Sequence, residues 1–490
     1  MSGNYQLPEL KNYIDGTFST PAVDRGHSLH DANTGALLQQ RRSCNHEQVQ
    51  AALQAADRVH RAGTWENTPA SERAELLDKL AEELAGEETA RTISTADSIT
   101  SGAVIRTTRK MANILPLVFR GAAAYLREGH LDKKVPGPCG EVDYLRRPWG
   151  PALLIAPWNG PTAIGSHKVA SALAAGAPCI LKPSEFTPHS AIMMARAAQR
   201  AGIPEGVFQL TLGDRTIGAQ MVEDPRIKAV SFTGGLAGGR AIARACADDF
   251  IPTQLELGGN NQLVVFADAD LDRAATGVVY GLTNLNGQWC RALGRLLVQE
   301  SVKDVLLDKV LSLLSTIHLG HSLDEESDMG PLVHRGHYDQ VLSDLERLQN
   351  RGGHLLSSTP LPDLAGNFVA PTLVDGCDPA DTREEIFGPV AAVHSFRNDD
   401  EALALANGTD LGLAGYVYSS DETKAFAFAR KMRTGGVKIN GYSLLSIGEG
   451  TPRGAWGLSG LGEEGHAQSI EFFTGARVIG ISPQDALGGR

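Results

Sequence analysis

The sequence lacks the features that mark several large classes of protein. Its six cysteines lie far apart and none forms a C-x-x-C pair, which excludes a compact zinc knuckle, predicts no metal site and fits a reducing compartment. No hydrophobic run approaches the ~20 residues that a membrane helix needs, and we expect no signal peptide because the first residues show no basic segment followed by an apolar one. These absences predict a soluble, cytoplasmic protein.

Positive charge is also scarce. The 45 lysines and arginines are outnumbered by 57 aspartates and glutamates, so the net charge is −12. A surface of this sign disfavours nucleic acid and acidic membranes as partners. The rest of the composition is ordinary: 42% hydrophobic and 21% charged residues are typical of globular proteins, and a chain of 490 residues suffices for roughly three domains.

The first part of the chain is predicted to contain a hairpin and helices. Tyr13–Phe18 has Asp-Gly at its centre, the pair that favours a type I′ turn. A helix is expected to start with Thr68 as its N-cap and Pro69 at its first position, and another to cover 111–126. The apolar stripe of the first helix is formed by Leu76, Leu77, Leu80 and Leu84.

Between 150 and 257, short apolar strands alternate with helices, one of which is expected to have Thr187 as its N-cap. Alternation at this spacing predicts a parallel, doubly wound sheet. Such a sheet binds ligands beyond the carboxyl ends of its strands. The second half, about 258–460, alternates again and is interpreted as a second α/β domain.

One cysteine of the second domain is a candidate nucleophile. Cys290 ends the stretch Asn286–Cys290, directly after an apolar segment. A lone intracellular cysteine is more often a small buried hydrophobe than a nucleophile. The presence of an Asn, a Glu and cofactor-type loops upstream favours the nucleophile.

Asn159 and Glu256 lie at strand ends of the first domain. The amide of Asn159 is suited to donate a hydrogen bond to an oxyanion, although an ordinary turn is the commoner use of Asn. Glu256, beside two glycines at an apolar strand end, suits a general base with a raised pKa or, equally, an ion-paired structural carboxylate.

Two further loops suit a dinucleotide. Phe232–Gly239 places small residues at a helix N-terminus, where free N–H groups meet a phosphate, although a glycine turn needed only for packing has the same pattern. Lys182 and Glu185 suit ribose hydroxyls or, alternatively, form a surface pair. A carboxylate there would repel a 2′-phosphate, which favours NAD over NADP.

Together these motifs resemble the NAD(P)-dependent aldehyde dehydrogenase superfamily over essentially the whole chain. The matching segments are Pro157–Pro161, Lys182–Glu185, Phe232–Gly239, Glu256–Gly259, Gly287–Cys290 and Glu384–Pro389, with a looser match at Pro452–Gly462. The resemblance implies an α/β fold of two doubly wound Rossmann-type domains and a small bridging sheet that joins subunits into a homodimer or homotetramer. The implied boundaries are 1–126 with 148–257 for the NAD-binding domain, 258–460 for the catalytic domain, and 127–147 with 461–490 for oligomerisation.

The resemblance also implies NAD-dependent oxidation of an aldehyde to its carboxylic acid. Cys290 would form a thiohemiacetal and then a thioester, Asn159 with the Cys290 N–H would hold the oxyanion, and Glu256 would activate the hydrolytic water. Lys168 matches a family lysine near the active site, with a proton relay as its candidate role. The implied NAD-binding residues are Ile155, Pro157, Trp158, Lys182, Ser184, Glu185, Phe232, Thr233, Gly234, Gly235, Gly239, Leu257, Glu385 and Phe387.

The chain departs from the resemblance in the region that relatives use for substrate. Arg453 stands where relatives have a tunnel phenylalanine, and Trp289 and Arg291 flank the nucleophile. Gly160 and His167 replace aromatics that line the tunnel in some relatives, which disfavours a cage for a quaternary ammonium group.

These departures suggest an aldehyde that carries a carboxylate, a hydroxyl or a ring substituent near Arg453. The alternative is that Arg453 pairs with an acid such as Glu449 or Glu463 and never meets the substrate.

Three other functions are considered. A CoA-acylating dehydrogenase would pass the thioester to a thiol, which the base Glu256 disfavours. A reductive enzyme would normally use NADPH, which Glu185 disfavours. A non-catalytic NAD-binding or structural homologue would not need Cys290, Glu256 and Asn159 together.

Overall fold

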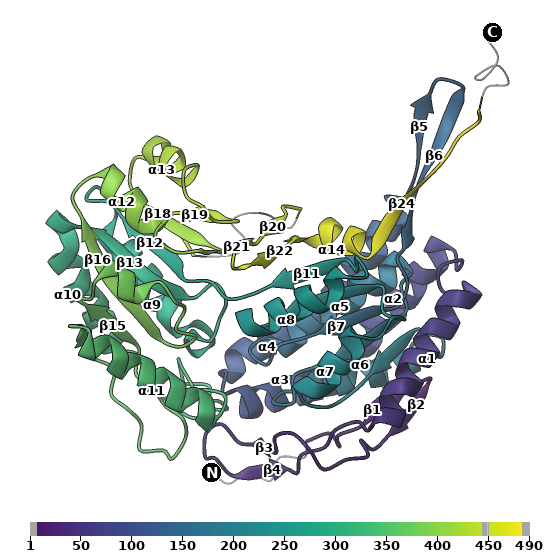
Figure 1. The fold of residues 1–490 in the computed structure, drawn as a ribbon. Helices are drawn as coiled ribbons and strands as arrows, with labels where there is room; N and C mark the ends of the chain where they lie inside the picture. Colours follow the sequence, from purple (N-terminus) through teal and green to yellow (C-terminus); the bar gives the residue numbers. More distant parts are fainter. Residues whose placement is uncertain (1–6, 443–447, 449, 483–490) are drawn as a thin grey trace.

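The computed structural model describes residues 7–442, 448 and 450–482, which form two α/β lobes and a projecting arm (Figure 1). Each lobe is built on its own sheet, and the arm is a third sheet of three strands. No helix in the described part of the chain is both long and apolar enough to cross a membrane.

The first lobe contains an eight-stranded sheet in the order β2-β1-β9-β8-β7-β10-β11-β22. The strands are β1 (Asn12–Ile14), β2 (Thr17–Ser19), β7 (Ala152–Ile155), β8 (Cys179–Lys182), β9 (Phe208–Leu210), β10 (Ala229–Thr233), β11 (Thr253–Glu256) and β22 (Gly460–Leu461). The five central strands are parallel, whereas β1 and β22 pair antiparallel with their neighbours. The sheet is therefore mixed at both edges, and the prediction of a parallel sheet is correct only for its centre.

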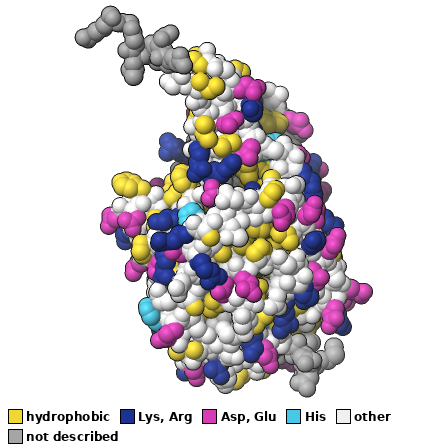
Figure 2. All heavy atoms as spheres, turned by 90° about the vertical axis from the view of Figure 1, so that its right-hand side faces the viewer, with side chains coloured by type: hydrophobic (Ala, Val, Ile, Leu, Met, Phe, Trp, Pro, Cys, Tyr) yellow, Lys and Arg dark blue, Asp and Glu magenta, His cyan; other side chains and the backbone are white. Residues whose placement is uncertain are grey.

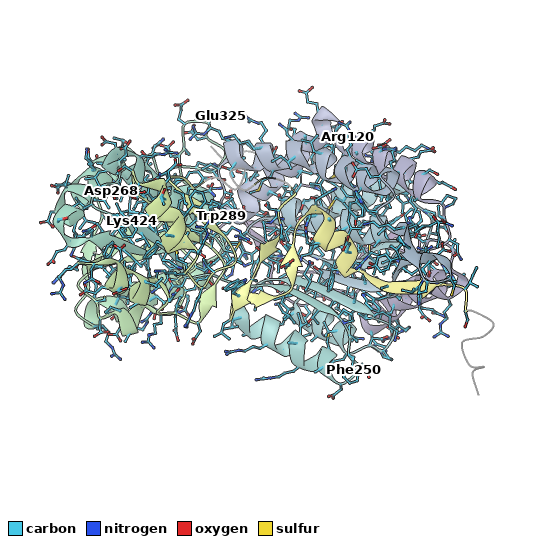
Figure 3. All side chains as sticks on the ribbon, turned by 90° about the horizontal axis from the view of Figure 1, so that it is seen from above. Arg120, Phe250, Asp268, Trp289, Glu325 and Lys424 are labelled. Atoms are coloured by element: carbon cyan, nitrogen blue, oxygen red, sulfur yellow. The ribbon has the colours of Figure 1, made fainter. Side chains whose placement is uncertain are left out.

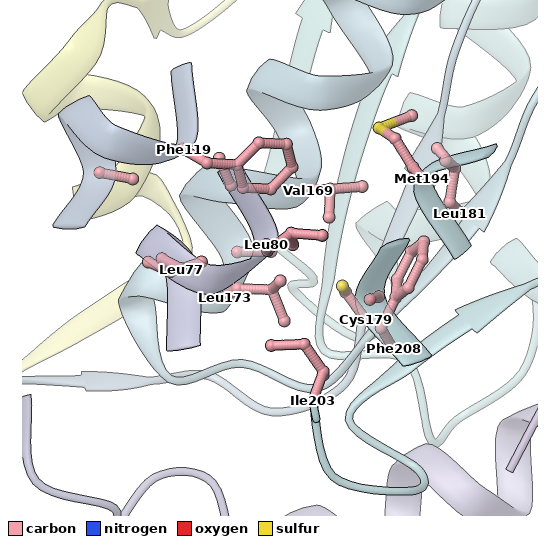
Figure 4. Close-up of a cluster of buried hydrophobic side chains, with 14 of the residues drawn as sticks. Leu77, Leu80, Phe119, Val169, Leu173, Cys179, Leu181, Met194, Ile203 and Phe208 are labelled. Atoms are coloured by element: carbon pink, nitrogen blue, oxygen red, sulfur yellow. The ribbon is translucent and has the colours of Figure 1, made fainter. Parts of the chain in front are cut away.

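The helices of this lobe pack around the sheet (Figure 1). They are α1 (His46–Ala62), α2 (Ala70–Leu84), α3 (Glu87–Ser101), α4 (Ile105–Arg127), α5 (Pro161–Ala175), α6 (His189–Arg200), α7 (Arg215–Val222) and α8 (Leu236–Ala247). Leu77 and Leu80 of the predicted α2 stripe are fully buried beside Leu173 of α5 and Cys179 of β8 (Figure 4). Removing such a side chain would cost about 2–5 kcal/mol.

Both predicted threonine N-caps are wrong. Helix α2 begins at Ala70 with Pro69 as its cap residue, because the hydroxyl of Thr68 donates to the carbonyl of Thr64 instead. Helix α6 begins at His189 after Pro188, and the buried Thr187 hydroxyl makes no hydrogen bond with the described residues. In both places the proline, not the threonine, stands next to the helix. The predicted Asp15-Gly16 turn is confirmed, since both residues have positive φ angles of 49° and 77°.

The second lobe contains a seven-stranded sheet in the order β14-β15-β16-β13-β12-β18-β19. The strands are β12 (Asn261–Val265), β13 (Leu293–Gln299), β14 (His354–Leu356), β15 (Thr372–Asp375), β16 (Val390–Phe396), β18 (Gly415–Tyr418) and β19 (Val437–Ile439). The helices are α9 (Leu271–Thr283), α10 (Lys303–Leu314), α11 (Arg335–Asn350), α12 (Asp399–Ala406) and α13 (Glu422–Ala429). All strand pairs are parallel except β14 with β15.

The arm joins β5 (Asp132–Gly137), β6 (Gly140–Pro148) and β24 (Thr474–Ile479) in one antiparallel sheet. It projects away from both lobes, and helix α14 (His466–Phe472) leads into its last strand (Figure 1). Short antiparallel pairs, β17 (Leu411–Gly412) with β21 (Trp456–Gly457) and β20 (Arg453–Gly454) with β23 (Glu463–Glu464), bring the C-terminal segment back across the junction of the lobes. A further short pair joins β3 (Leu29–His30) to β4 (Leu37–Gln39).

Candidate active site

The loop that carries Cys290 has an unusual backbone. Leu285, Asn286 and Gly287 have consecutive positive φ angles of 51°, 59° and 72° in the turn between α9 and β13. A Cβ atom at Gly287 would clash with the backbone of Gly388 and Pro389, so only glycine fits there. The turn ends the helical path after α9 and directs the Cys290 side chain toward Glu256 of the first lobe.

Side-chain amides hold this turn in place. The Asn286 amide donates to the carbonyls of Gly102 and Pro331 at 2.8 and 2.9 Å, and its oxygen accepts from the Gly330 N–H at 2.9 Å. Gln288 accepts from the Val333 N–H at 3.0 Å. A non-glycine residue in the left-handed region is strained, and here these buried hydrogen bonds compensate the strain at Asn286.

The residues after the turn are fixed as firmly. Asn261 donates to the carbonyls of Cys290 and Ala292 at 2.9 and 2.7 Å. The carbonyl of Arg291 accepts from two tyrosine hydroxyls, Tyr416 at 2.8 Å and Tyr442 at 3.0 Å. Sequence reasoning did not identify these supporting side chains.

The Cys290 thiol meets a carboxylate from the other lobe. Its Sγ donates to Glu256 Oε1 at 3.6 Å, and Arg291 Nη2 lies 3.8 Å from the same oxygen. Burial and the charge of Glu256 raise the pKa of Cys290 well above its ordinary value. Burial, followed by the charge of Glu464, raises the pKa of Glu256, while Arg291 opposes the shift. Glu256 thus has the properties of a general base.

Asn159 lies beside the same loop. It follows β7, and its Nδ2 donates to the carbonyl of Gln288 at 2.9 Å. That bond uses one of the two amide hydrogens. The other has no partner among the described residues.

Further charged residues, here called the charged layer, lie near Glu256 and act on it electrostatically. Lys168 of α5 has its Nζ 3.6 Å from Glu464 Oε1 and 2.8 Å from the hydroxyl of Ser231, to which it donates. Burial lowers the pKa of Lys168. Burial opposes ionisation of Glu464, but Lys168 and the neighbouring basic groups hold its pKa below the ordinary value. Glu464 was missed in the sequence, although it adjoins Glu463, which was considered as a partner of Arg453.

The four residues predicted to face substrate separate into two groups. Arg291 and the partly buried Arg453 belong to the charged layer, and Arg453 pairs through its backbone with Glu464. His167 is also there; burial lowers its pKa to about 4, and Nε2 shares a 2.8 Å hydrogen bond with the Ser469 hydroxyl. Trp289 instead packs against Tyr280 and Tyr442 where the two lobes meet (Figure 3).

The expected ion pair of Arg453 with Glu463 does not form: no carboxylate among the described residues lies in ion-pair contact with its guanidinium. Glu449, the other expected partner, lies outside the described residues.

The cofactor-type residues lie where the strands of the first sheet end. Lys182, the last residue of β8, has its Nζ 3.6 Å from Glu185 Oε2, and Ser184 lies between them in the same loop. Ile155 ends β7 and is followed by Pro157 and Trp158. Because β7 and β8 are parallel neighbours, these carboxyl ends lie side by side at one end of the sheet.

The glycine loop between β10 and α8 has room for an anion. A Cβ atom at Gly235 would meet nothing within 4 Å, whereas one at Gly239 would lie 2.6 Å from the side chain of Leu257. A Cβ at Gly234 would lie 2.5 Å from the ring of Phe232. The buried Thr233 hydroxyl makes no hydrogen bond with the described residues. Open space, a helix N-terminus and an orphaned hydroxyl fit a bound phosphate group.

The second lobe completes this region. Glu385 accepts from the Gly259 N–H at 2.9 Å, and burial raises its pKa to about 7. The ring of Phe387 meets Trp158 edge to face at 5.4 Å. His337, which sequence reasoning missed, contacts the Trp158 ring at 5.3 Å and bonds to the Phe387 carbonyl at 2.6 Å.

Comparisons with known proteins identify the family. The model of the aldehyde dehydrogenase family matches residues 21–479. The chain is 34% identical over 484 residues to a non-phosphorylating aspartate-semialdehyde dehydrogenase of Halomonas elongata, covering 96% of this chain and 97% of the relative. It is 32% identical over 464 residues to a geranial dehydrogenase of Castellaniella defragrans, covering 94% and 96%.

Solved structures show the same fold. A betaine aldehyde dehydrogenase of Staphylococcus aureus in complex with NAD+ superposes with a TM-score of 0.91 at 28% identity, covering 98% of this chain and 96% of that one. An aldehyde dehydrogenase of Pseudomonas aeruginosa gives a TM-score of 0.92 at 29% identity, with 97% of each chain covered. The predicted fold class is confirmed.

Proposed function

The chain belongs to the aldehyde dehydrogenase family, and we propose that it oxidises an aldehyde to its carboxylic acid, with NAD as electron acceptor, through a thiohemiacetal and a thioester on Cys290. The observation that carries the proposal is the 3.6 Å contact between the Cys290 thiol and Glu256 Oε1, with the Asn159 amide bonded to the adjoining peptide. A nucleophile, a base and an oxyanion donor thereby meet at one point.

In the first step Glu256 removes the proton of the thiol. The contact is direct, and the raised pKa of the carboxylate makes it a better proton acceptor than an exposed one. The thiolate of Cys290 then adds to the aldehyde carbon. The remaining Asn159 amide hydrogen and the Cys290 N–H stabilise the developing oxyanion.

The residues at the sheet edge are assigned to NAD. Lys182 and Glu185 would hold the hydroxyls of one ribose, the loop from Gly234 to Gly239 the phosphates, and Glu385 with Phe387 the nicotinamide end. Bound there, NAD supplies the acceptor for the hydrogen that leaves the aldehyde carbon. The carboxylate of Glu185 disfavours the extra phosphate of NADP.

In the last step Glu256 activates a water molecule that hydrolyses the thioester. Neighbouring charges set the pKa of this base: Glu464 raises it, whereas Arg291 and Lys168 lower it. Lys168 and Glu464 also offer a path by which the proton leaves the buried site. A base next to the thioester favours hydrolysis over transfer to the thiol of CoA.

We also infer that the arm joins subunits. Val135, Val478, Ile479 and Ile481 are exposed on or beside it, and Figure 2 shows hydrophobic side chains on this part of the surface. An edge strand with exposed apolar residues favours pairing with another chain. Light scattering should give the mass of a dimer or tetramer, and the double variant Val478→Lys/Ile479→Lys a smaller mass. Leu361→Lys, at an exposed leucine elsewhere, should leave the mass unchanged.

A cytoplasmic location is proposed as well. All six cysteines are unpaired, which suits a reducing compartment.

The reaction is tested by NADH formation from purified protein and a panel of aliphatic, aromatic and carboxylate-bearing aldehydes, with NAD and then NADP. The proposal expects turnover with NAD that Cys290→Ala abolishes and that CoA does not stimulate. The matched control is Cys139→Ala, at an exposed thiol. Turnover that survives in Cys290→Ala, or that requires CoA, would contradict it.

A further inference from the structure

The charged residues that surround Cys290 and Glu256 include more basic than acidic groups. Four cations, Lys168, Arg291, Lys438 and Arg453, act electrostatically on Cys290 or Glu256 or both. Among the described residues, the carboxylates that interact with these cations are Glu256 and Glu464. Glu385 also acts on Cys290, but it is bonded to the Gly259 N–H in the region assigned to the cofactor.

Two of the four cations are paired. Lys168 lies 3.6 Å from Glu464, and Arg291 lies 3.8 Å from Glu256. These pairs use both carboxylates. Lys438 and Arg453 are left without an ion pair to any carboxylate in the described part of the chain.

Lys438 is the more unusual of the two because it is buried. It stands in β19, with its Nζ donating to the carbonyl of Tyr442 at 3.3 Å and lying 5.1 Å from the centre of the Tyr416 ring. Neither contact supplies a full negative charge. Burial, and then repulsion by Arg291 and Arg453, lowers the pKa of Lys438 to about 7. A buried ammonium without a counter-ion is costly.

Arg453 reaches the same region from β20. It is partly buried, its backbone pairs with Glu464, and its charge acts on Glu256, His167 and Lys438. Two cations from different strands, neither ion-paired within the described part of the chain, therefore act on the surroundings of the nucleophile and its base. An anion placed between them would relieve their repulsion and form two charge-assisted hydrogen bonds.

We propose that the aldehyde oxidised by this chain carries a carboxylate, which Lys438 and Arg453 bind while Cys290 attacks the aldehyde carbon. The inference rests on the proposed function and adds the substrate class to it. The same charges repel an aldehyde with a quaternary ammonium group.

The test uses three aldehydes of similar size that differ in charge: succinic semialdehyde, butanal and betaine aldehyde. We expect kcat/KM with NAD to be at least tenfold higher for succinic semialdehyde than for butanal, and lowest for betaine aldehyde. Lys438→Met and Arg453→Gln should each reduce the ratio of the first two values about tenfold, which corresponds to ~1.4 kcal/mol. Arg453→Lys should restore part of it.

Lys431→Met is the matched control, since Lys431 is an exposed lysine of the same lobe, and it should keep the selectivity of the parent. Thermal melting checks that each variant folds. If Lys438→Met does not fold, the partly buried Arg453 still permits the test.

The outcomes separate the two proposals. Absence of NADH formation from every aldehyde would contradict the proposed function and the substrate class with it. Turnover of butanal or betaine aldehyde at least as efficient as that of succinic semialdehyde would overturn the substrate class alone. So would a preference for succinic semialdehyde that neither variant reduces.

Discussion

Cys290 Sγ and Glu256 Oε1 lie 3.6 Å apart although their side chains belong to different sheets, Glu256 to the end of β11 and Cys290 to the loop before β13. The site therefore exists only where the two lobes meet. Each lobe positions one of the two groups. The turn at Leu285–Gly287 fixes the thiol, and the buried end of β11 fixes the carboxylate.

The pH dependence of hydrolysis should respond to Glu464. A general base acts in its ionised form, so activity falls as the pH drops through the pKa of Glu256, which Glu464 helps to raise. Glu464→Gln removes that negative charge, lowers the pKa of Glu256 and should move the acid limb of the kcat profile to lower pH. Glu223→Gln, at an exposed glutamate, should leave it in place. An acid limb that moves to higher pH, or stays, would contradict the assignment.

Alkylation of Cys290 should be suppressed at neutral pH. Burial and Glu256 raise the pKa of the thiol, so the reactive thiolate forms only as the pH rises through that value. Iodoacetamide labelling of the Cys290 peptide, followed by mass spectrometry from pH 7 to 10 in a Cys139→Ala background, should still increase at the top of the range. With Glu256→Gln, the labelling profile should shift to lower pH. Equal profiles would show that the two groups do not interact.

Asn159→Ala should impair catalysis far more than folding. The amide bonds the Gln288 carbonyl at 2.9 Å and has one hydrogen left for the oxyanion. Removing one oxyanion donor typically costs about 10²–10³ in kcat, whereas a partly exposed hydrogen bond contributes only about 1 kcal/mol to stability. Steady-state kinetics and thermal melting separate the two effects. A large loss of stability with little change in kcat would assign Asn159 to structure.

Cofactor choice should depend on Glu185. Its carboxylate lies 3.6 Å from Lys182 at the end of β8, and it would repel the 2′-phosphate of NADP. Glu185→Gln should raise the ratio of kcat/KM for NADP to that for NAD by about tenfold or more, since apposed like charges cost several kcal/mol. Glu205→Gln, at an exposed position of the same lobe, serves as control. A ratio unchanged by Glu185→Gln would move the selectivity elsewhere.

The sequence pattern predicted the features that depend on neighbouring residues, such as strands and turns. The strands that end near Asn159 and Glu256 follow from short apolar runs, and the Asp15-Gly16 turn from its residue pair. The caps at Thr68 and Thr187 were wrong because the adjacent proline changed which residue borders the helix.

Glu464 and Lys438 were beyond such reasoning. Glu464 enters the site through a two-residue strand pair with Arg453, and Lys438 through the edge strand β19, and no local periodicity marks either residue. The hypothesis of a carboxylate-bearing substrate near Arg453 stays a prediction, to which the structure adds Lys438, whose pKa is lowered by the charge of Arg453.

The central claim is a thioester on Cys290 that Glu256 hydrolyses. Glu256→Gln, mixed with NAD and an aldehyde that the parent oxidises, tests it most directly. The account predicts that, at a pH where the Cys290 thiolate forms without the help of Glu256, the variant releases about one NADH per active site, then turns over slower by about 10²–10⁴, and carries an acyl group on the Cys290 peptide in the mass spectrum. Steady turnover at the parent rate with no adduct on Cys290 would contradict it.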